Sequence, residues 1–353
     1  MIACRAPGKL YIAGEYAVIE PGFPAVLIAV DRYTTAHVAE ADATAVTSDL
    51  FGDKLISLER VDGRLVAPTC DGLDYVTSAI WVVERLLTEL GHPVRQFRLR
   101  LTSALHDGRG MKYGLGSSAA VTVATIAALA RFHGLRLELM DRYRLAMLAT
   151  IRVAPDCSGG DVAASTWGGW ISYRGPDRGT LSRRLRRDGV EVLLRENWPG
   201  LSVKALPTPT SARVVAGWTG HPATTRAEAG VIVGDDSCAG FRAASRDCVD
   251  RLSAAIEDDD PMRIREQLRR ARLLLEKLDT ATGLGIMTPE LAGLCAIAES
   301  VGAVAKPSGA GGGDCGIALV TSDAQLTQLR DRWRAGGIQP LPLHTHPTEQ
   351  DQP

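Results

Sequence analysis

The sequence predicts an α+β protein divided into two domains. Strand-like and helix-like hydrophobic patterns alternate along the 353 residues, and apolar residues make up 45% of the chain. Because a single hydrophobic core stops growing at about 250–300 residues, a chain of this length and composition is expected to form two domains. The alternation is also compatible with an α/β arrangement, since it does not give the order of the strands in a sheet.

The first half of the chain carries the clearest alternation. Phe97, Leu99 and Leu101 alternate with polar side chains, as in a half-buried strand, whereas residues 141–152 place apolar side chains at helical spacing. In chain order we expect strands at 3–5, 10–13 and 25–38, a helix at 74–90, a strand at 97–105, helices at 118–133 and 141–152, and a strand at 169–173. A charged, irregular passage at 174–188 then offers the best boundary, and we assign residues 1–195 to the first domain.

The second domain is expected at residues 196–340. Its patterns predict strands at 201–206 and 213–217, helices at 237–257, 261–278 and 289–301, and a final strand at 317–320 after a glycine-rich segment. The closing residues 341–353 are mostly polar and contain proline, which predicts a disordered tail.

Composition limits the classes of function. A net charge of −1 gives no general attraction to nucleic acid or to a membrane surface. No apolar run reaches the roughly 18 residues of a membrane span and no signal-peptide core opens the chain, so we expect a cytoplasmic protein. The seven cysteines are scattered and odd in number, which indicates free thiols, and a buried state is favoured for Cys315 over a reactive one. The oligomeric state stays open between monomer and homodimer.

The most distinctive segment is a glycine- and serine-rich loop that opens a helix at residues 112–120. Such a loop offers backbone N–H groups at the positive end of the helix dipole, which predicts an anion site. Ser117 and Ser118 add hydroxyls for a cap or a metal ion, and Lys112 adds a positive charge. The segment also fits the loose dinucleotide-binding pattern, but a whole loop at 106–110 separates it from the preceding strand, and a dinucleotide turn would be tighter.

Two further segments strengthen the prediction of a phosphate site. At residues 6–18 a lone lysine, Lys9, stands at a proline-glycine corner before a short apolar strand. At residues 305–316 a glycine cluster lies between a helix and a strand. Glycine costs roughly 0.5–1 kcal/mol against alanine in regular structure, so such a cluster indicates that something approaches the backbone closely. The flanking segments are apolar and regular, unlike those of a flexible linker.

Together with Ser158-Gly159-Gly160-Asp161 and the residues that follow, these segments resemble the ordered motifs of the GHMP small-molecule kinases. The motifs span nearly the whole chain. The resemblance implies a ribosomal-S5-like N-terminal domain, a ferredoxin-like C-terminal domain and an active site between them. It also implies ATP and Mg²⁺ as cofactors. The residues expected to hold ATP are Lys112, Gly114, Leu115, Gly116, Ser117, Ser118 and Ala119, and Ser118 is the expected ligand of Mg²⁺.

The resemblance further implies a catalytic pair, Lys9 and Asp161. Lys112, Tyr16 after Gly14-Glu15, and the Ser308-Gly309 pair resemble family members that act on phosphomevalonate in the mevalonate route to isoprenoids. Mevalonate or another small alcohol as acceptor remains an alternative, and so does a catalytically inactive binding protein. A phosphate acceptor with a pKa of about 6 is mostly a dianion at pH 7 and needs no base, so we expect Asp161 chiefly to orient Lys9 and the acceptor.

The substrate side is expected to include residues from three motifs: Glu15, Tyr16, Ser158, Gly159, Lys306, Ser308, Gly309, Ala310 and Gly311. Glu15 could equally pair with Lys9. The candidates to hold the 5-phosphate of the substrate are Lys112, Arg152, His221 and Lys306. A second metal ligand is unassigned: Asp156 is a candidate, although an aspartate beside a proline more often serves a turn.

Overall fold

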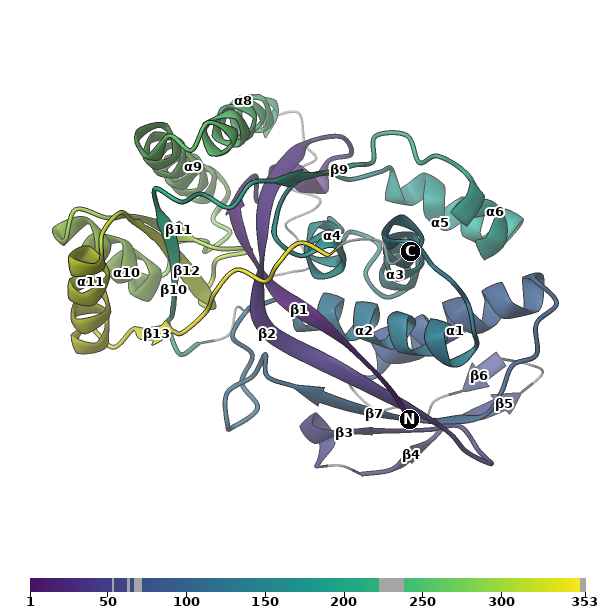
Figure 1. Ribbon diagram of the computed structural model, residues 1–353. Coiled ribbons are helices and arrows are strands. Elements are labelled where there is room, and N and C mark those ends of the chain that lie inside the picture. Colours follow the sequence, from purple (N-terminus) through teal and green to yellow (C-terminus); the bar gives the residue numbers. More distant parts are fainter. Residues whose placement is uncertain (53, 62–63, 67–71, 222–237, 350–353) are drawn as a thin grey trace.

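The computed structural model describes residues 1–52, 54–61, 64–66, 72–221 and 238–349. Within these residues the chain builds two layered assemblies, each consisting of a sheet with helices packed on it (Figure 1). The first contains β1 (Ile2–Ala13), β2 (Pro24–Glu40), β3 (Ala45–Ser48), β4 (Ile56–Ser57), β5 (Glu59–Val61), β6 (Arg64–Val66), α1 (Asp74–Glu89), β7 (Phe97–Ser103), α2 (Ser117–Phe132), α3 (Leu139–Val153), α4 (Gly160–Trp167), β8 (Trp170–Arg174), α5 (Arg178–Asp188), α6 (Val190–Arg195) and β9 (Ser202–Leu206). The second contains β10 (Arg213–Trp218), α8 (Ala239–Glu257), α9 (Pro261–Thr282), α10 (Pro289–Ser300), β11 (Val304–Pro307), β12 (Cys315–Val320), α11 (Asp323–Ala335) and β13 (Gln339–Leu341).

The sheets establish the α+β class. The larger sheet has the order β4-β3-β7-β2-β8-β9, with β1 also paired to β2, and only its β3–β7 pair is parallel among the described residues. The smaller sheet, β11-β12-β10-β13, is antiparallel throughout. Antiparallel sheets covered by helices are typical of α+β rather than α/β folds, so the α+β prediction is confirmed.

Strand β1 is longer than its sequence pattern indicated. We expected two short strands, at 3–5 and 10–13, because Pro7 and Gly8 interrupt the apolar pattern. The structure instead carries β1 continuously past β2, with one register shift between Pro7 and Gly8 and another between Tyr11 and Ala13. Such bulges accommodate residues that would break a regular ladder and re-aim the side chains beside them.

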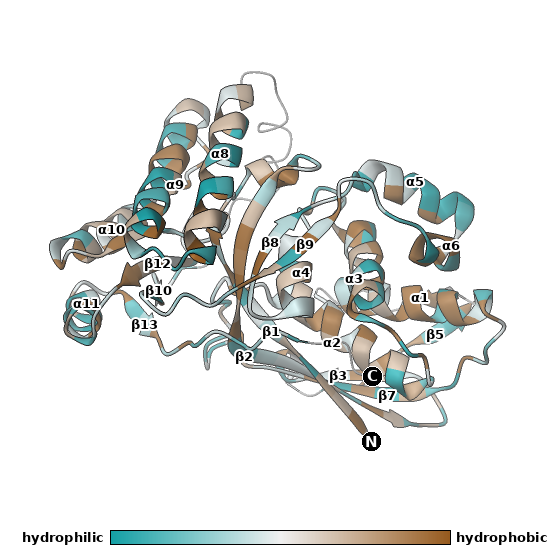
Figure 2. Cartoon of the chain, turned by 45° about the horizontal axis from the view of Figure 1, so that its top comes forward, coloured by the Kyte–Doolittle hydropathy of each residue, from teal (hydrophilic) through white to brown (hydrophobic). Residues whose placement is uncertain are grey.

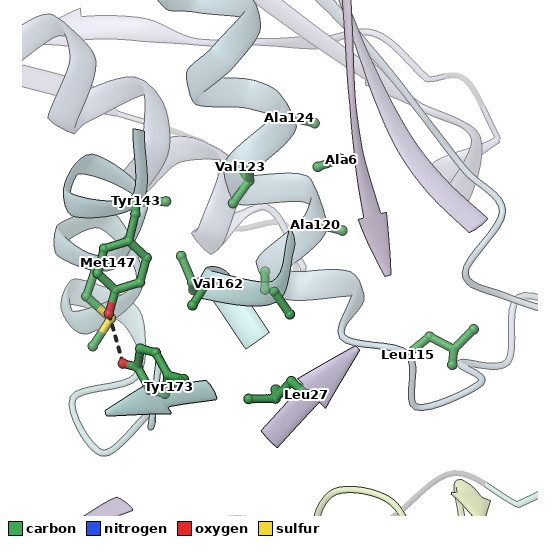
Figure 3. Close-up of a cluster of buried hydrophobic side chains, with 14 of the residues drawn as sticks. Ala6, Leu27, Leu115, Ala120, Val123, Ala124, Tyr143, Met147, Val162 and Tyr173 are labelled. Carbon is green, nitrogen blue, oxygen red and sulfur yellow. Dashed lines mark hydrogen bonds between the residues drawn. The ribbon is translucent and has the colours of Figure 1, made fainter. Parts of the chain in front are cut away.

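The core of the larger assembly depends on small side chains. Ala119, Ala120 and Ala124 of α2 are buried, and so is Ala6 of β1. Figure 3 shows Ala6 facing the alanine stripe of α2, with Val123 and Val162 filling the space toward α3. Small side chains at this contact bring the start of α2 close to β1, which is where the functional motifs meet.

The structure differs from the sequence expectations at two points near the proposed boundary. The charged passage at 174–188 is not irregular: it contains α5, which Asp177 caps by accepting from the N–H of Thr180. Figure 2 shows α5 as one of the most hydrophilic helices, and a helix with so few apolar residues gives little periodicity to detect. Strand β9 also pairs with β8 in the larger sheet, whereas the sequence boundary placed its residues in the second domain.

The tail that we expected to be disordered from residue 341 is ordered through residue 349. It returns to the larger sheet, where His346 donates its N–H to the carbonyl of Ala29 at 2.9 Å and accepts from the N–H of Gly169 at 2.9 Å. Gly168 is tight against this segment, since a Cβ there would lie 2.2 Å from the carbonyl oxygen of Pro347. Backbone pairing thus orders a segment whose composition is polar.

Two simpler features concern the helices and the thiols. Among the described residues, none of the helices combines the length and apolarity needed to cross a membrane. Six cysteines, all but Cys70, lie in the described part of the chain, and each is a free thiol, as expected.

Candidate active site

Lys9 is placed by a close contact between β1 and the phosphate loop, residues 112–118. Its backbone N–H donates to the carbonyl of Leu115 at 2.9 Å, and its ammonium donates to the carbonyl of Gly114 at 3.1 Å. Gly8 permits this approach, because a Cβ there would lie 2.9 Å from the Leu115 carbonyl oxygen. Lys9 is only 7% exposed, so its charge is held in a fixed place within the protein.

The phosphate loop has the backbone geometry that its glycines suggested. Gly114 and Gly116 adopt φ angles of 79° and 77°, a left-handed conformation that favours glycine. Gly116 is the N-cap of α2, so Ser117 and Ser118 occupy the first two helical positions. Gly116 offers no side chain to cap this helix start, and both serines are partly exposed. Their hydroxyls and the first backbone N–H groups of α2 therefore form an anion-binding arrangement at a helix N-terminus.

The glycine loop, residues 308–314, approaches the same point from the second assembly. Gly309 faces the Lys9 ammonium, which would lie 4.0 Å from a Cβ at that position. At the far end of the loop, Asp314 is buried with a left-handed φ of 37°. Its side chain lies against Gly114, where a Cβ would come within 2.6 Å. Lys9 is thus the place where the three sequence motifs meet.

Ser308 joins the glycine loop to β1. Its hydroxyl accepts from the backbone N–H of Tyr11 at 2.9 Å and donates to the carbonyl of Tyr11 at 3.0 Å. These backbone groups lie at the second register shift of β1, where pairing with β2 is interrupted. The buried hydroxyl therefore satisfies a local gap in the ladder.

Asp161 lies in the first turn of α4, which begins next to the Tyr11 side chain. Gly160 allows the Tyr11 phenol to lie directly on the helix start, since a Cβ there would be 2.7 Å from the phenol oxygen. Burial raises the pKa of Tyr11, and the charge of Asp161 raises it further. The Lys9 ammonium lies 5.5 Å from the Tyr11 ring centre. Lys9 and Asp161 therefore both act on one neutral phenol, that of Tyr11.

A chain of hydroxyls supports this arrangement from the core. The Tyr11 phenol shares a hydrogen bond of 2.8 Å with the hydroxyl of Ser158, and Tyr173 donates to the Ser158 carbonyl at 2.8 Å. Tyr143 and Tyr173 share a further hydrogen bond of 2.8 Å, which Figure 3 draws between the two buried rings. Gly159 precedes α4 with a φ of 77°, and a Cβ there would clash with Met147 at 2.5 Å.

Glu15 and Lys306 are brought together in the interior. Their side chains are 3% and 0% exposed and form an ion pair between the Lys306 ammonium and Glu15 Oε1. Lys306 is thus an ion-pair partner of Glu15. Beside it, the Tyr16 hydroxyl donates to the carbonyl of Ala310 at 2.5 Å.

Arg152 and Lys112 are two further residues that were considered for the 5-phosphate of the substrate. Arg152 stacks on Trp81 at 3.6 Å from the ring centre and donates to the Ser78 hydroxyl at 3.2 Å. It lines a cavity of about 510 Å³ among α1, α3 and α5. Lys112 is exposed and lies near His106, whose pKa is lowered by burial and by the Lys112 charge.

Sequence reasoning missed Tyr11 and Asp314 as members of the site. Tyr11 carried a detectable signal, because it lies two residues after Lys9, and alternate residues of a strand face the same side. Asp314 carried a weaker one, as the charged residue that ends the glycine run. His221 lies beside it, with its carbonyl accepting from the Asp314 N–H at 2.7 Å.

Comparisons with known proteins agree with this geometry. Residues 74–169 match the family model described as GHMP kinases N terminal domain, and residues 252–339 match GHMP kinases C terminal. The chain is 47% identical to a phosphomevalonate kinase from Streptomyces sp. (strain CL190), over 97% of this chain and 96% of that protein.

Two solved structures have the same fold as this chain. The crystal structure of a Lin0012 protein from Listeria innocua superposes with a TM-score of 0.91 at 31% identity, covering 98% of both chains. The Streptococcus pneumoniae phosphomevalonate kinase in complex with phosphomevalonate and AMPPNP superposes with a TM-score of 0.86 at 30% identity, covering 98% of this chain and 100% of that chain.

Proposed function

The chain belongs to the GHMP kinase family, and on that premise we propose that it transfers the γ-phosphoryl group of ATP to (R)-5-phosphomevalonate, giving 5-diphosphomevalonate and ADP. The observation that carries the choice of acceptor is the 47% identity to a phosphomevalonate kinase over almost the whole of both chains. The similar Streptococcus pneumoniae enzyme binds the same acceptor, phosphomevalonate, together with AMPPNP. We expect the enzyme to act in the cytoplasm, as a monomer or a homodimer.

The reaction joins two anions, so its main requirement is charge neutralisation and alignment. Lys9 supports the proposal because its ammonium is held at the phosphate loop, where the γ-phosphoryl group would be transferred. The N–H groups at the start of α2, together with Lys112, would hold the remaining phosphates of ATP. An acceptor phosphate with a pKa of about 6 is already largely ionised at pH 7, so the chemistry needs no general base.

Asp161 is proposed to orient the acceptor and Lys9. Its place beside Tyr11 supports this role, because the same phenol lies under the Lys9 ammonium. The substitution Asp161→Asn tests it: with an orienting role, the loss of kcat is the same at every pH. Two other outcomes would instead indicate a general base. One is a kcat that recovers as the pH rises, and the other is a loss of about 10⁴-fold confined to one limb of the plot of kcat against pH.

The donor set at the start of α2 fits Mg²⁺ carried by ATP. Ser118 offers a partly exposed hydroxyl there, and among the described residues no group of three or more acidic, histidine or cysteine side chains forms a separate metal site. Mg²⁺ takes oxygen ligands, keeps several waters and is commonly held by one or two protein groups plus phosphates. Ser118 would then be its ligand from the protein, and the metal would neutralise phosphate charge.

Of the four basic residues considered for the 5-phosphate, two are engaged elsewhere. Lys306 is paired with Glu15, and Arg152 is stacked on Trp81. Lys112 and His221 remain the proposed candidates, the second because its backbone lies at the end of the glycine loop.

One coupled assay tests the proposed function. ADP release from ATP is measured with mevalonate, 5-phosphomevalonate or 5-diphosphomevalonate as acceptor. We expect turnover with 5-phosphomevalonate; turnover with mevalonate alone would reject this choice, and turnover with none would favour an inactive binding protein. Lys9→Met should abolish turnover while the fold is retained, whereas Lys277→Met, at an exposed position on α9, serves as the matched control.

A further inference from the structure

Glu15 and Lys306 were both expected to contact the substrate, but they form a buried ion pair with each other. The Lys306 side chain is fully buried, and its ammonium donates both to Glu15 Oε1 and to the carbonyl of Pro307, at 2.6 Å. Moving this ammonium toward an anionic substrate would leave the Glu15 carboxylate buried without its partner. Stranding a buried charge in this way is strongly unfavourable, so Lys306 is not available as a substrate ligand.

The same carboxylate also reaches the glycine loop. Glu15 Oε1 accepts a long hydrogen bond, 3.4 Å, from the backbone N–H of Gly309. One residue further along each segment, the Tyr16 hydroxyl donates to the Ala310 carbonyl at 2.5 Å. Glu15 and Tyr16 follow β1, whereas Gly309 and Ala310 follow β11, so these contacts tie the glycine loop to the strand that carries Lys9.

The position of Gly309 connects this contact to the reaction. Its α-carbon faces the Lys9 ammonium, which a Cβ at this position would approach to 4.0 Å. A shift of the loop would therefore change both the surroundings of Lys9 and the place of the acceptor. Misplacement of reacting groups by about 1 Å can cost roughly 100-fold in rate.

We propose that Glu15 and Lys306 are positioning residues: the Lys306 ammonium holds the Glu15 carboxylate in place, and Glu15 sets the glycine loop against Lys9. This inference rests on the proposed phosphoryl transfer. It replaces the direct substrate contact that we expected of both residues with an indirect role. Tyr16 has the same role through the Ala310 carbonyl.

Two double variants separate positioning from simple stabilisation. Glu15→Gln with Lys306→Met removes both charges but keeps an oxygen that can accept from the Gly309 N–H. Glu15→Met with Lys306→Met removes the charges and that acceptor as well. Neutral replacement of a buried pair is often tolerated, so both variants should fold, which circular dichroism and thermal unfolding check.

The proposal predicts different kinetics for the two variants when both are folded. The glutamine variant should keep kcat within several-fold of the wild type, whereas the methionine variant should lose about 10- to 100-fold in kcat with the KM for ATP unchanged. Equal kcat values in the two folded variants would overturn the proposal. If both double variants fail to fold, the test uses Tyr16→Phe, which removes only a hydroxyl. An unchanged kcat in Tyr16→Phe would also overturn the proposal.

The comparison is made with whichever acceptor the wild-type protein phosphorylates. If the wild-type protein does not use 5-phosphomevalonate, the proposed function is wrong. The positioning role is tested separately, by whether kcat differs between the glutamine and methionine variants.

Discussion

The side chain of Lys9 lies directly on the α-carbon of Gly116: a Cβ at Gly116 would come within 3.0 Å of both Cγ and Cε of the lysine. The glycine therefore serves two purposes at once. Its φ of 77° turns the chain into α2, and its missing side chain leaves room for the buried lysine. The phosphate loop and the Lys9 side chain are packed as a single unit.

The substitution Gly116→Ala should for this reason damage catalysis more than folding. The added methyl group displaces the Lys9 side chain and strains the backbone, which we expect to lower kcat by at least about 100-fold. A left-handed alanine also costs about 1–2 kcal/mol of stability. Steady-state kinetics and urea unfolding measure the two effects. Gly108→Ala is the control, because a Cβ at Gly108 meets nothing within 4 Å, and equal kcat values in the two variants would contradict the expectation.

Cys315 joins the two assemblies at the same place. Its thiol donates to the carbonyl of Tyr113 at 2.8 Å, and burial raises its pKa. A protonated, inaccessible thiol reacts slowly, so Cys315 should resist iodoacetamide in the native protein and become labelled only on unfolding in urea. Peptide mass spectrometry reports the labelling. Rapid labelling without denaturant would mean that the contact between Cys315 and Tyr113 opens in solution.

His133, at the end of α2, should make stability depend on pH. Burial, followed by the charges of Arg95 and Arg60, lowers the pKa of His133 from 6.5 to about 4. The unfolded chain therefore binds a proton below pH 6.5 that the folded protein takes up only near pH 4. The free energy of unfolding should therefore fall as the pH drops from 6.5 to about 4. Below that pH, protonation of His133 should cause no further loss of stability.

The variant His133→Phe tests this dependence. A phenyl ring can keep the edge-on packing against Phe97 and Phe132 but cannot be protonated. Urea unfolding at pH 7 and pH 5 should show a smaller loss of stability in the variant than in the wild type. His92→Phe, at an exposed position, is the control, and equal losses in the wild type and His133→Phe would rule the effect out.

The ordered tail should contribute to stability. Its backbone pairs with Ala29, Asp31, Trp167 and Gly169, and each buried hydrogen bond contributes about 1 kcal/mol. Deletion of residues 344–353 should therefore cost about 2–4 kcal/mol, whereas deletion of residues 350–353 alone should cost much less. Thermal unfolding of both truncated chains measures the difference. If the chain that lacks residues 344–353 keeps the Tm of the full-length protein, the backbone pairing of the tail contributes no stability.

The local parts of the site were predictable. Gly114, Gly116 and the run from Gly309 identified backbone that must turn left-handed or be approached closely, and Lys9 was found because it stands alone at a proline-glycine corner. The break expected at Pro7 was wrong, since sheet pairing with β2 carries the strand through a bulge. Helix α5 and the tail were missed because one is too polar to show periodicity and the other is ordered by distant backbone groups.

The sequence by itself determined the four motifs, because these depend on residue types that shape their own backbone, and the resemblance of the motifs to those of the GHMP kinases indicated the family and the α+β class. The partners of the buried charges were decided only by the tertiary structure. Lys306 and Glu15 are 291 residues apart, and no local pattern indicates that a lysine in a glycine-rich motif is fully buried against that carboxylate. The free energy of a charge depends on what surrounds it in space, so the distinction between a residue that binds substrate and one that positions the site appears only in the folded protein.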